Sequence, residues 1–389
     1  MTLLAALSAL SLTAWAYLAL AHGRFWHCDQ RLDGRAPAPA AWPRVVAVVP
    51  ARDEADVLPA TLRSLLDQDY PGEFAIVLVD DESRDGTADV AERLRREHPM
   101  GARLRVTHTA ARPNGWVGKM WALQCGVDAA AKADLAPAWW LFTDADVAHG
   151  QGNLRRLVAK GEADRLDLVS LMVRLHMSRA WHALLVPAFV YFFQKLYPFP
   201  RINDPRARTA GAAGGCVLLR PAALARAGGV EALRAEVIDD CALGRNIKRT
   251  GGRLWVGLSA TEHSIRPYTG ISDVWNMVAR SAFTQLHHSL GIVAGTALGL
   301  ALLYLLPPLA LVTLPLHGDL AAAGFGAGAW LLQAATFAPT LALYERRPVW
   351  GLALPIAGAL SMGMTIDSAR RHLRNQGAMW KGRAGAGHA

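Results

Sequence analysis

The sequence predicts an α/β fold with a mainly parallel central sheet, flanked by transmembrane helices. Two observations lead to this prediction. Between Arg44 and Ser289, short apolar runs rich in β-branched residues alternate with segments of helical periodicity, an order that is typical of strand-helix-strand units. Both ends of the chain contain uncharged apolar stretches of about 20 residues, the length that crosses the hydrocarbon core of a membrane.

The strands and helices of the central domain can be located along the chain. Val45–Val49 is a continuous apolar run, as expected of a parallel strand that is buried on both faces, and it ends at Pro50. Ligands of parallel sheets bind at the carboxyl ends of the strands, so the residues just after each strand are candidates for a site. The next predicted elements are helix Asp56–Gln68, strand Phe74–Val79, helix Ala88–Glu97, and strands Leu104–His108 and Trp139–Thr143.

The N-terminal apolar segment predicts a membrane helix within residues 1–23. Leu3 to Ala21 carries no charged residue, and no basic residue precedes it, which disfavours a cleaved signal peptide. The linker that follows, residues 24–43, contains several arginines. By the positive-inside bias these arginines place the next domain, residues 44–289, in the cytoplasm. We therefore expect a membrane protein whose next domain faces the cytoplasm.

Two further spans are predicted within a hydrophobic region at residues 290–366. They run from Leu290 to Leu316 and from Leu320 to Leu343, and a short turn joins them. The loop after the second span contains Arg346 and Arg347, and it is therefore expected in the cytoplasm, as a hairpin of two spans requires.

The last hydrophobic segment, Val349 to Ile366, allows two interpretations. If it crosses the membrane, the basic tail at residues 367–389 lies outside, against the charge bias. If Pro355 and Gly358 interrupt it, a re-entrant or interfacial segment keeps the tail inside. The sequence alone leaves a total of three or four membrane segments open.

Charge and cysteine content exclude other classes of protein. The formal net charge is +9, but the basic residues are not interleaved with aromatic residues, and no zinc-ligand spacing occurs, so we expect no nucleic-acid partner. Basic residues beside membrane segments are expected to meet anionic lipid headgroups instead. The four cysteines are widely scattered without a Cys-x-x-Cys pair, which predicts reduced, packed residues.

Two carboxylates follow the strand Trp139–Thr143 directly. Asp144 and Asp146 are separated by one residue, and at a strand end they are well placed to hold a divalent cation against a diphosphate. The alternative is a solvated turn or a helix cap, because an Asp-x-Asp triplet is common by chance.

Acidic pairs also occur earlier and later in the chain. Asp80 and Asp81 end the second predicted strand, where they can accept hydrogen bonds from a base N–H and a ribose hydroxyl; alternatively, Asp81 and Ser83 cap the next helix. Asp239 and Asp240 lie between two further predicted helices, and a cap is again an alternative. Those helices span Ala222–Ala235 and Ala242–Arg249.

Lys119 follows Gly115 and Gly118, so a flexible glycine-containing stretch brings an ammonium group near phosphate oxygens. The alternative is an exposed lysine at the start of a helix.

Taken in order, these motifs resemble those of the family 2 glycosyltransferases over residues 44–280. The resemblance implies a GT-A (nucleotide-diphospho-sugar transferase) fold, a nucleotide-diphospho-sugar donor and inversion at the anomeric carbon. The motifs that carry it are PARDE at 50–54, VDDESRDGT at 79–87, GWVGKMWAL at 115–123, TDAD at 143–146, and Asp239-Asp240 followed by CALGRNIKRTGGR.

The resemblance also implies roles for single residues. Asp240 would be the general base; the family has Glu-Asp at this pair, so Asp239 departs from the pattern and its role stays open. Asp146 would bind Mg²⁺ or Mn²⁺ directly, with Asp144 nearer the ribose or a metal-bound water. The nucleotide-sugar-binding residues would be Pro50, Ala51, Arg52, Glu54, Asp80, Asp81, Gly118, Lys119, Asp144 and Arg280.

Within the family, the membrane segments and the stretches SRDGT, GWVGK and RSAFTQLHHS most resemble the hopene-associated glycosyltransferases of hopanoid-making bacteria. The Gln-x-x-Arg-Trp motif of processive synthases is replaced by Asn276 to Phe283, which favours a single transfer. The expected acceptor is therefore a membrane lipid, with a hopanoid as the narrower expectation. A ceramide-type or polyprenyl-phosphate glycosyltransferase and a non-catalytic scaffold of lipid synthesis are the alternatives.

Overall fold

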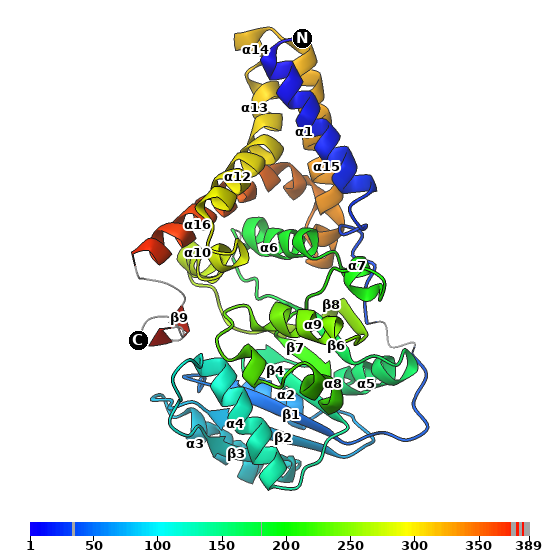
Figure 1. Cartoon of the computed structure of the whole chain (residues 1–389), viewed down its shortest axis with the longest axis vertical. Coiled ribbons are helices and arrows are strands. Elements are labelled where there is room, and N and C mark those ends of the chain that lie inside the picture. Colours follow the sequence, from blue (N-terminus) through cyan, green and yellow to red (C-terminus); the bar gives the residue numbers. More distant parts are fainter. Residues whose placement is uncertain (33–35, 180, 375–378, 381–382, 385–389) are drawn as a thin grey trace. The chain divides into compact units, whose positions relative to one another are not determined.

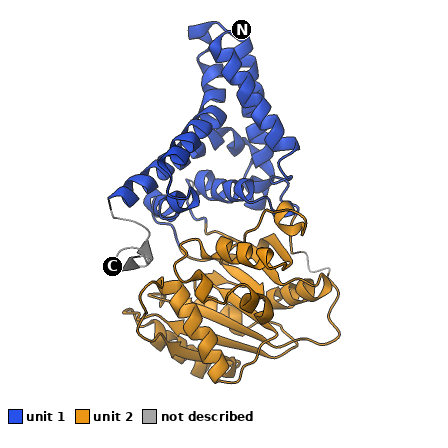
Figure 2. Cartoon of the chain, viewed as in Figure 1, with its two compact units in different colours: residues 1–29, 177–200, 267–378 blue, residues 30–176, 201–266, 379–389 orange. Residues whose placement is uncertain are grey.

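The computed structural model describes residues 1–389 except 33–35, 180, 375–378, 381–382 and 385–389 (Figure 1). The chain forms two compact units, each built from separate segments (Figure 2). The segments at 177–200 and 267–289, which the sequence places in the cytoplasmic domain, group with the apolar helices in unit 1. Unit 1 contains Met1–Asp29, Met177–Pro200 and Pro267–Ala378, and unit 2 contains Gln30–His176, Arg201–Arg266 and Met379–Ala389.

Unit 2 is built around an eight-stranded sheet with the strand order β3-β2-β1-β4-β7-β6-β8-β5. A separate pair of short strands comprises β9 (Met379–Trp380) and β10 (Arg383–Ala384). The strands of the main sheet are β1 (Val45–Ala51), β2 (Phe74–Asp80), β3 (Leu104–His108), β4 (Trp139–Thr143), β5 (Val147–Ala148), β6 (Leu168–Arg174), β7 (Cys216–Leu219) and β8 (Leu254–Ser264).

The helices of unit 2 connect these strands. α4 and α3 lie beside the strands β1 to β3 in Figure 1. The helices are α2 (Leu58–Leu66), α3 (Thr87–Glu97), α4 (Gly118–Lys132), α5 (Asn153–Ala163), α8 (Pro221–Arg226) and α9 (Asp239–Arg249), with 3-10 turns at Gly101–Arg103 and Glu231–Leu233; α7 (Phe199–Asn203) crosses the boundary between the units along the chain.

The sheet is mixed, and parallel pairings outnumber antiparallel ones among its described strands, in agreement with the mainly parallel sheet that the sequence predicts. β3, β2, β1 and β4 are parallel to one another, and β6 is parallel to β8, but β7 pairs antiparallel with both β4 and β6, and β5 pairs antiparallel with β8. β7 is reversed because the chain enters it at the edge where β4 ends, with Cys216 opposite Thr143. The residues just before β7 therefore lie beside the residues just after β4.

The core of unit 2 explains why the strand predictions are accurate. Every residue of β1 is buried, as expected of a strand covered on both faces. Trp139 of β4 is also completely buried, and its indole N–H donates to Glu162 at 2.8 Å. Strands β3 and β4 have the predicted bounds, while β1 continues to Ala51 and β2 to Asp80.

The four helices predicted for this part of the chain have different bounds in the structure, and for α3 the difference is one residue, Thr87 instead of Ala88. α2 begins at Leu58 instead of Asp56, with Pro59 in its first turn. The predicted helix Ala222–Ala235 is wrong, because Gly228 and Gly229 adopt positive φ angles of 93° and 71° and end α8 at Arg226. α9 begins at Asp239, so both aspartates lie in its first turn and do not precede it.

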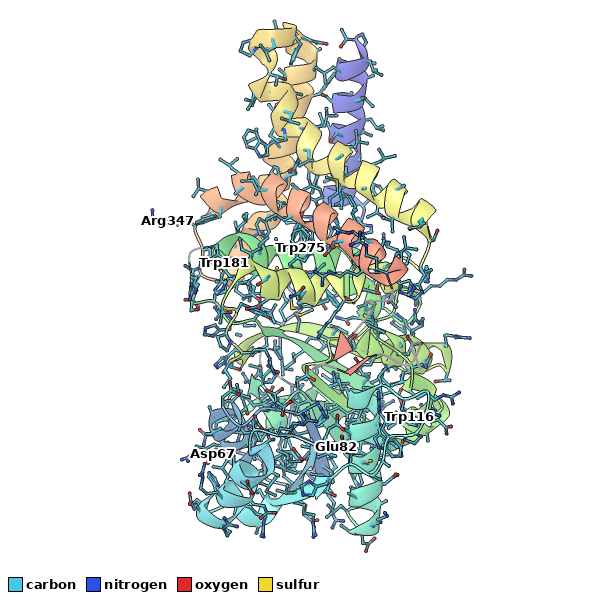
Figure 3. All side chains as sticks on the ribbon, turned by 90° about the vertical axis from the view of Figure 1, so that its left-hand side faces the viewer. Asp67, Glu82, Trp116, Trp181, Trp275 and Arg347 are labelled. Atoms are coloured by element: carbon cyan, nitrogen blue, oxygen red, sulfur yellow. The ribbon has the colours of Figure 1, made fainter. Side chains whose placement is uncertain are left out.

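Unit 1 is helical. Its elements are α1 (Leu3–Leu20), α6 (His182–Leu196), α10 (Ile271–Ala279), α11 (Ala282–Gln285), α12 (Leu290–Leu300), a π-helix (Ala301–Leu305), α13 (Leu306–Val312), α14 (Leu314–His317), α15 (Leu320–Leu343), a 3-10 helix (Pro348–Ala353) and α16 (Leu354–Leu373). Trp275 of α10, labelled in Figure 3, donates its indole N–H to Asp367 of α16 at 2.8 Å.

Four helical stretches of the described residues are long and apolar enough to cross a membrane, which suggests a membrane protein. The last one continues as a helix past Pro355 and Gly358, the two residues at which one of the two interpretations of the sequence places an interruption. Pro355 lies in the first turn of α16, where a missing N–H breaks no helical bond, and Gly358 packs directly against Tyr304. The four stretches are Leu3–Leu20, Leu290–Val312, Leu320–Leu343 and Pro348–Leu373.

The four cysteines are free thiols, as expected. Cys28, Cys216 and Cys241 are buried, and Cys125 is half-buried.

Candidate active site

The topology of unit 2 brings several of the predicted site residues to one edge of the sheet. β1, β2 and β4 are parallel, so their carboxyl ends lie at the same edge. Asp80 is the last residue of β2, and Asp144 follows β4. The loop before β7 reaches the same edge: the Thr143 hydroxyl donates to the Gly215 carbonyl at 2.8 Å, and the Asp144 N–H approaches that oxygen at 3.4 Å.

A pocket at this edge contains four of the predicted polar residues. The ammonium Nζ of Lys119 lies 3.0 Å from Asp144 Oδ1 and 3.3 Å from Asp239 Oδ2, and Asp240 lines the same pocket. One cation and three carboxylates therefore face a common space. The remaining lining is mostly apolar: Pro50, Met120, Leu123, Phe142, Thr143, Gly214, Val217, Leu233 and Leu243.

Lys119 lies in the first turn of α4, but it is not the exposed lysine that the sequence allows as an alternative. Its side chain is only 21% exposed. Burial disfavours the charged ammonium, yet the negative charges of Asp144 and Asp239 raise the pKa of Lys119 above its ordinary value. Burial raises the pKa of Asp144, and the neighbouring carboxylates of Asp146 and Asp239 raise it further, against the opposing effect of Lys119.

Asp240 is held by two backbone N–H groups. Its Oδ2 accepts from the Gly214 N–H at 2.8 Å, and its Oδ1 accepts from the Cys241 N–H at 2.7 Å. Burial, followed by the charge of Asp239, raises the pKa of Asp240 to about 6, although Lys119 and the two N–H groups oppose this rise. The N-cap position of α9 is Ile238, so neither aspartate is the cap that the sequence allows as an alternative.

The helix that carries Asp240 lies in close contact with the loop that fixes it. A Cβ added at Gly244 of α9 would lie 2.6 Å from the Gly211 carbonyl carbon and 2.7 Å from its oxygen. Only glycine allows α9 to approach the loop before β7 this closely.

Replacing Gly244 by Ala is therefore expected to destabilise unit 2. Overpacking against backbone costs about 1–3 kcal/mol, and the better helix preference of alanine offsets about 1 kcal/mol of this cost. Thermal unfolding followed by tryptophan fluorescence measures the effect, with Gly152→Ala as the control because a Cβ at Gly152 meets open space. An equal melting temperature for Gly244→Ala and wild type would contradict this packing argument.

Asp146 has different partners from Asp144. Its Oδ2 accepts from the Ser264 hydroxyl at 2.8 Å and from Arg266 Nε at 3.2 Å. The Arg266 Nη2 also donates to both carboxylate oxygens of Glu54, at 2.5 and 2.7 Å. Sequence reasoning missed Ser264 and Arg266, although they end and follow the apolar strand β8, and the same strand-end rule points to them.

The fit of a divalent cation depends on these two carboxylates. Among the described residues, no group of three or more His, Cys, Asp or Glu side chains converges as a metal site. Mg²⁺ and Mn²⁺ are commonly held by one or two carboxylates, with substrate phosphates and water as further ligands. The oxygen donors of Asp144 and Asp146 suit such a shared site.

The residues after β1 and β2 form a second group. Asp81 is fully buried; its Oδ1 accepts from the Thr109 hydroxyl at 3.2 Å, and Arg52 Nη1 lies 3.6 Å from its Oδ2. Asp80 Oδ1 and Arg52 Nε are buried, and neither has a hydrogen-bond partner among the described residues. This arrangement leaves polar atoms available to a ligand.

The capping alternative for Asp81 and Ser83 is wrong. The N-cap of α3 is Gly86, with a φ of 86°, and Asp85 accepts from the Thr87 N–H at 3.0 Å. The hydroxyl of Ser83 instead accepts from the Asp53 N–H at 3.0 Å.

The other predicted site residues are distributed as follows. Ala51 ends β1, and Gly118 begins α4 directly before Lys119. Arg280 is exposed and follows α10 in unit 1, whereas the pocket belongs to unit 2.

Comparison with protein families identifies the domain that contains this pocket. Residues 46–227 match the family described as Glycosyl transferase family 2. The chain contains a glycosyltransferase family 2 domain. It is accordingly an enzyme of the glycosyltransferase class. The matched residues of this domain include Lys119, Asp144 and Gly214 and end before Asp239.

Two solved structures are similar to the chain, and the first of them shares its fold. The mannosyltransferase PcManGT from Pyrobaculum calidifontis, in complex with GDP-Man and Mn²⁺, is 22% identical with a TM-score of 0.58, over 96% of this chain and 100% of that chain. TarS from S. aureus is 16% identical with a TM-score of 0.41, over 84% and 54% of the two chains. No curated protein matches the chain. The first similarity supports a GT-A fold with a central mixed sheet and several long apolar helices.

Proposed function

We propose that the protein is a membrane-bound, metal-dependent, inverting glycosyltransferase that transfers one sugar from a nucleotide-diphospho-sugar to a lipid hydroxyl. The observation that carries this proposal is the pocket of unit 2, where Lys119 and Asp144 of the family 2 domain lie together with Asp239 and Asp240. Such a pocket offers a carboxylate that can accept the proton of the acceptor hydroxyl, and charged groups that can stabilise a diphosphate as it leaves.

The nucleoside of the donor binds beside Asp80 and Asp81 in this proposal, next to the backbone after Pro50. Two buried atoms without a hydrogen-bond partner among the described residues, Asp80 Oδ1 and Arg52 Nε, support this location, because a ligand would satisfy them. A nucleotide-sugar donor also agrees with the GDP-Man of the mannosyltransferase that shares the fold.

Asp146 and Asp144 would hold Mg²⁺ or Mn²⁺ together with the diphosphate. When bound, the cation would neutralise the negative charge that develops on the leaving diphosphate. Lys119 adds a second positive charge on the same side of the pocket, 3.0 Å from Asp144. The Mn²⁺ in the structure of the mannosyltransferase supports the choice of a divalent cation.

Asp240 acts as the general base. The acceptor oxygen attacks the anomeric carbon while Asp240 takes its proton, and the bond from the anomeric carbon to the diphosphate breaks with its electron pair on the diphosphate. Attack opposite to the leaving group inverts the anomeric centre. The N–H groups of Gly214 and Cys241 fix the Asp240 carboxylate, and its raised pKa makes it a stronger base than an ordinary aspartate.

The acceptor in this proposal is a membrane lipid, with a hopanoid as the specific candidate. The four long apolar helices of the described residues support a lipid acceptor, since they suit an enzyme that works at a membrane. The hopanoid assignment rests on the resemblance of SRDGT, GWVGK and RSAFTQLHHS to hopene-associated enzymes. The catalytic unit is expected on the cytoplasmic side of a bacterial inner membrane.

The proposed function is tested by incubating the purified full chain with Mn²⁺, a panel of nucleotide-sugars and total membrane lipid from a hopanoid-making bacterium. We expect a lipid whose mass increases by one sugar residue, with one nucleotide-sugar preferred. Asp240→Asn protein provides the matched control for contaminating activity. If ceramide or polyprenyl phosphate is glycosylated instead, the proposed acceptor is wrong. A series of products that differ by one sugar each would contradict single transfer. If no nucleotide-sugar yields a product, the proposed function is rejected.

A further inference from the structure

Arg266 connects two acidic side chains at the sheet edge of unit 2. It follows β8, and the Ile265 N–H donates to the Asp146 carbonyl at 2.9 Å, which keeps the two segments together. From this position Arg266 Nη2 donates to both oxygens of Glu54, and Nε donates to Asp146 Oδ2 at 3.2 Å. One guanidinium thus joins the segment after β1 to the segment after β4.

The contact between Arg266 and Asp146 uses a carboxylate that the proposed function assigns to the metal. The Asp146 side chain is 16% exposed, and its Oδ2 accepts from both Ser264 and Arg266. A divalent cation on this carboxylate would lie close to the positive guanidinium. Like charges repel strongly in a partly buried site, so the two cations cannot share Asp146 without a large cost.

We propose that Arg266 occupies Asp146 while no donor is bound, and releases it when a divalent cation and a nucleoside diphosphate arrive. This inference rests on the proposed function, because it takes Asp146 as a metal ligand. Arg266 is thereby a positioning residue that sets the affinity of the site for the metal.

The contact with Glu54 explains where the guanidinium goes. Glu54 is buried and both of its carboxylate oxygens accept from Arg266 Nη2, so Nε can leave Asp146 while this ion pair persists. The planar guanidinium is well suited to phosphate oxygens, and a donor diphosphate beside Asp146 would provide them. The diphosphate thus removes the competitor of the metal, and metal and nucleotide should bind with positive coupling, each raising the affinity of the other by the same factor.

Titration calorimetry of the detergent-purified full chain with Mn²⁺ alone tests the proposal. We expect Arg266→Gln to bind Mn²⁺ at least about tenfold more tightly than wild type, which is a typical size for coupling between sites. Adding GDP or UDP should strengthen Mn²⁺ binding strongly in wild type and much less in Arg266→Gln. Arg266→Lys, which keeps the charge, should remain closer to wild type.

The matched control is Arg156→Gln, which removes the same charge. Arg156 contacts Glu262 of β8 at 3.4 Å, as Arg266 contacts Glu54, but no contact joins it to Asp146 among the described residues. We expect this variant to keep the wild-type affinity for Mn²⁺.

Three results would overturn the proposal: unchanged or weaker Mn²⁺ binding by folded Arg266→Gln, the same gain in Arg156→Gln, or no Mn²⁺ binding by either wild type or Arg266→Gln. Thermal unfolding checks that each variant is folded. The transfer assay of the wild-type protein distinguishes failure of the proposed function from failure of the role of Arg266. Sugar transfer by wild type, with unchanged metal affinity in Arg266→Gln, rejects the role of Arg266 and leaves the proposed function intact.

Discussion

Replacing Asp240 by Asn is expected to lower the rate of sugar transfer by about 10²–10⁴-fold, the usual contribution of a general base. The amide keeps the size of the side chain and can still accept from the Gly214 or Cys241 N–H, but it cannot take the proton of the acceptor. Nucleotide binding should stay nearly unchanged, because Asp240 does not contact the residues assigned to the nucleoside. Rates from a transfer assay and nucleotide affinity from calorimetry distinguish these two effects.

Asp239→Asn is the matched comparison for this variant. Asp239 lies in the same turn of α9, but it contacts Lys119 and not the backbone N–H groups that orient Asp240. We expect a smaller loss of transfer, caused by the altered charge around Lys119. If Asp240→Asn retains transfer and Asp239→Asn loses it, Asp239 is the base.

Replacing Asp146 by Ala is expected to abolish metal-dependent transfer while the protein remains folded. The side chain lies at the edge of the sheet, outside the apolar core, so its removal leaves no large cavity. Transfer measured over a range of Mn²⁺ concentrations should show no recovery at high metal, and Mn²⁺ binding measured by calorimetry should be lost. The melting temperature reports on folding.

Asp164→Ala controls for the loss of an acidic side chain. Asp164 is exposed at the end of α5, where it pairs with Lys160. This variant should transfer sugar and bind Mn²⁺ as wild type does. Unchanged turnover of Asp146→Ala would remove the metal role from Asp146.

The parts of the fold that the sequence predicts well are those that local patterns determine. The strands Leu104–His108 and Trp139–Thr143 and the helix Leu320–Leu343 have the predicted bounds. Trp139–Thr143 and Leu320–Leu343 are uncharged and mostly apolar, whereas Leu104–His108 alternates apolar and polar residues in its first four positions, which is the pattern of a partly exposed strand.

The differences arise where distant segments decide the structure. Nothing near Cys216 in the sequence indicates that β7 runs antiparallel, since its direction depends on where the chain re-enters the sheet. The early end of α8 at Gly228 and Gly229 has a local signal, because adjacent glycines favour positive φ angles, and the apolar residues around them outweighed it in the prediction.

The candidate site shows the same division. Asp144 is predicted from a strand end and Lys119 from the neighbouring glycines, whereas Asp239 and Asp240 are predicted from the order of motifs in the resemblance. These four side chains line one pocket. The pairing of Asp146 with Arg266 is not predicted, because 120 residues separate the two positions and only the antiparallel pairing of β5 with β8 brings them together.

The hydrogen bonds around Gly214 and Gly215 have a consequence for how the enzyme adapts to temperature and to new substrates. The Gly215 carbonyl accepts from the hydroxyl of Thr143, the residue before Asp144, and the Gly214 N–H donates to Asp240. In the proposed mechanism, the pairing of β4 with β7 therefore helps to set the spacing between Asp144 on the leaving-group side and Asp240 on the acceptor side. Thermal motion of surface loops should change the affinity for substrates. It should leave the proposed alignment of the acceptor oxygen opposite the leaving diphosphate unchanged. A change of acceptor preference could then evolve while inversion at the anomeric carbon is kept.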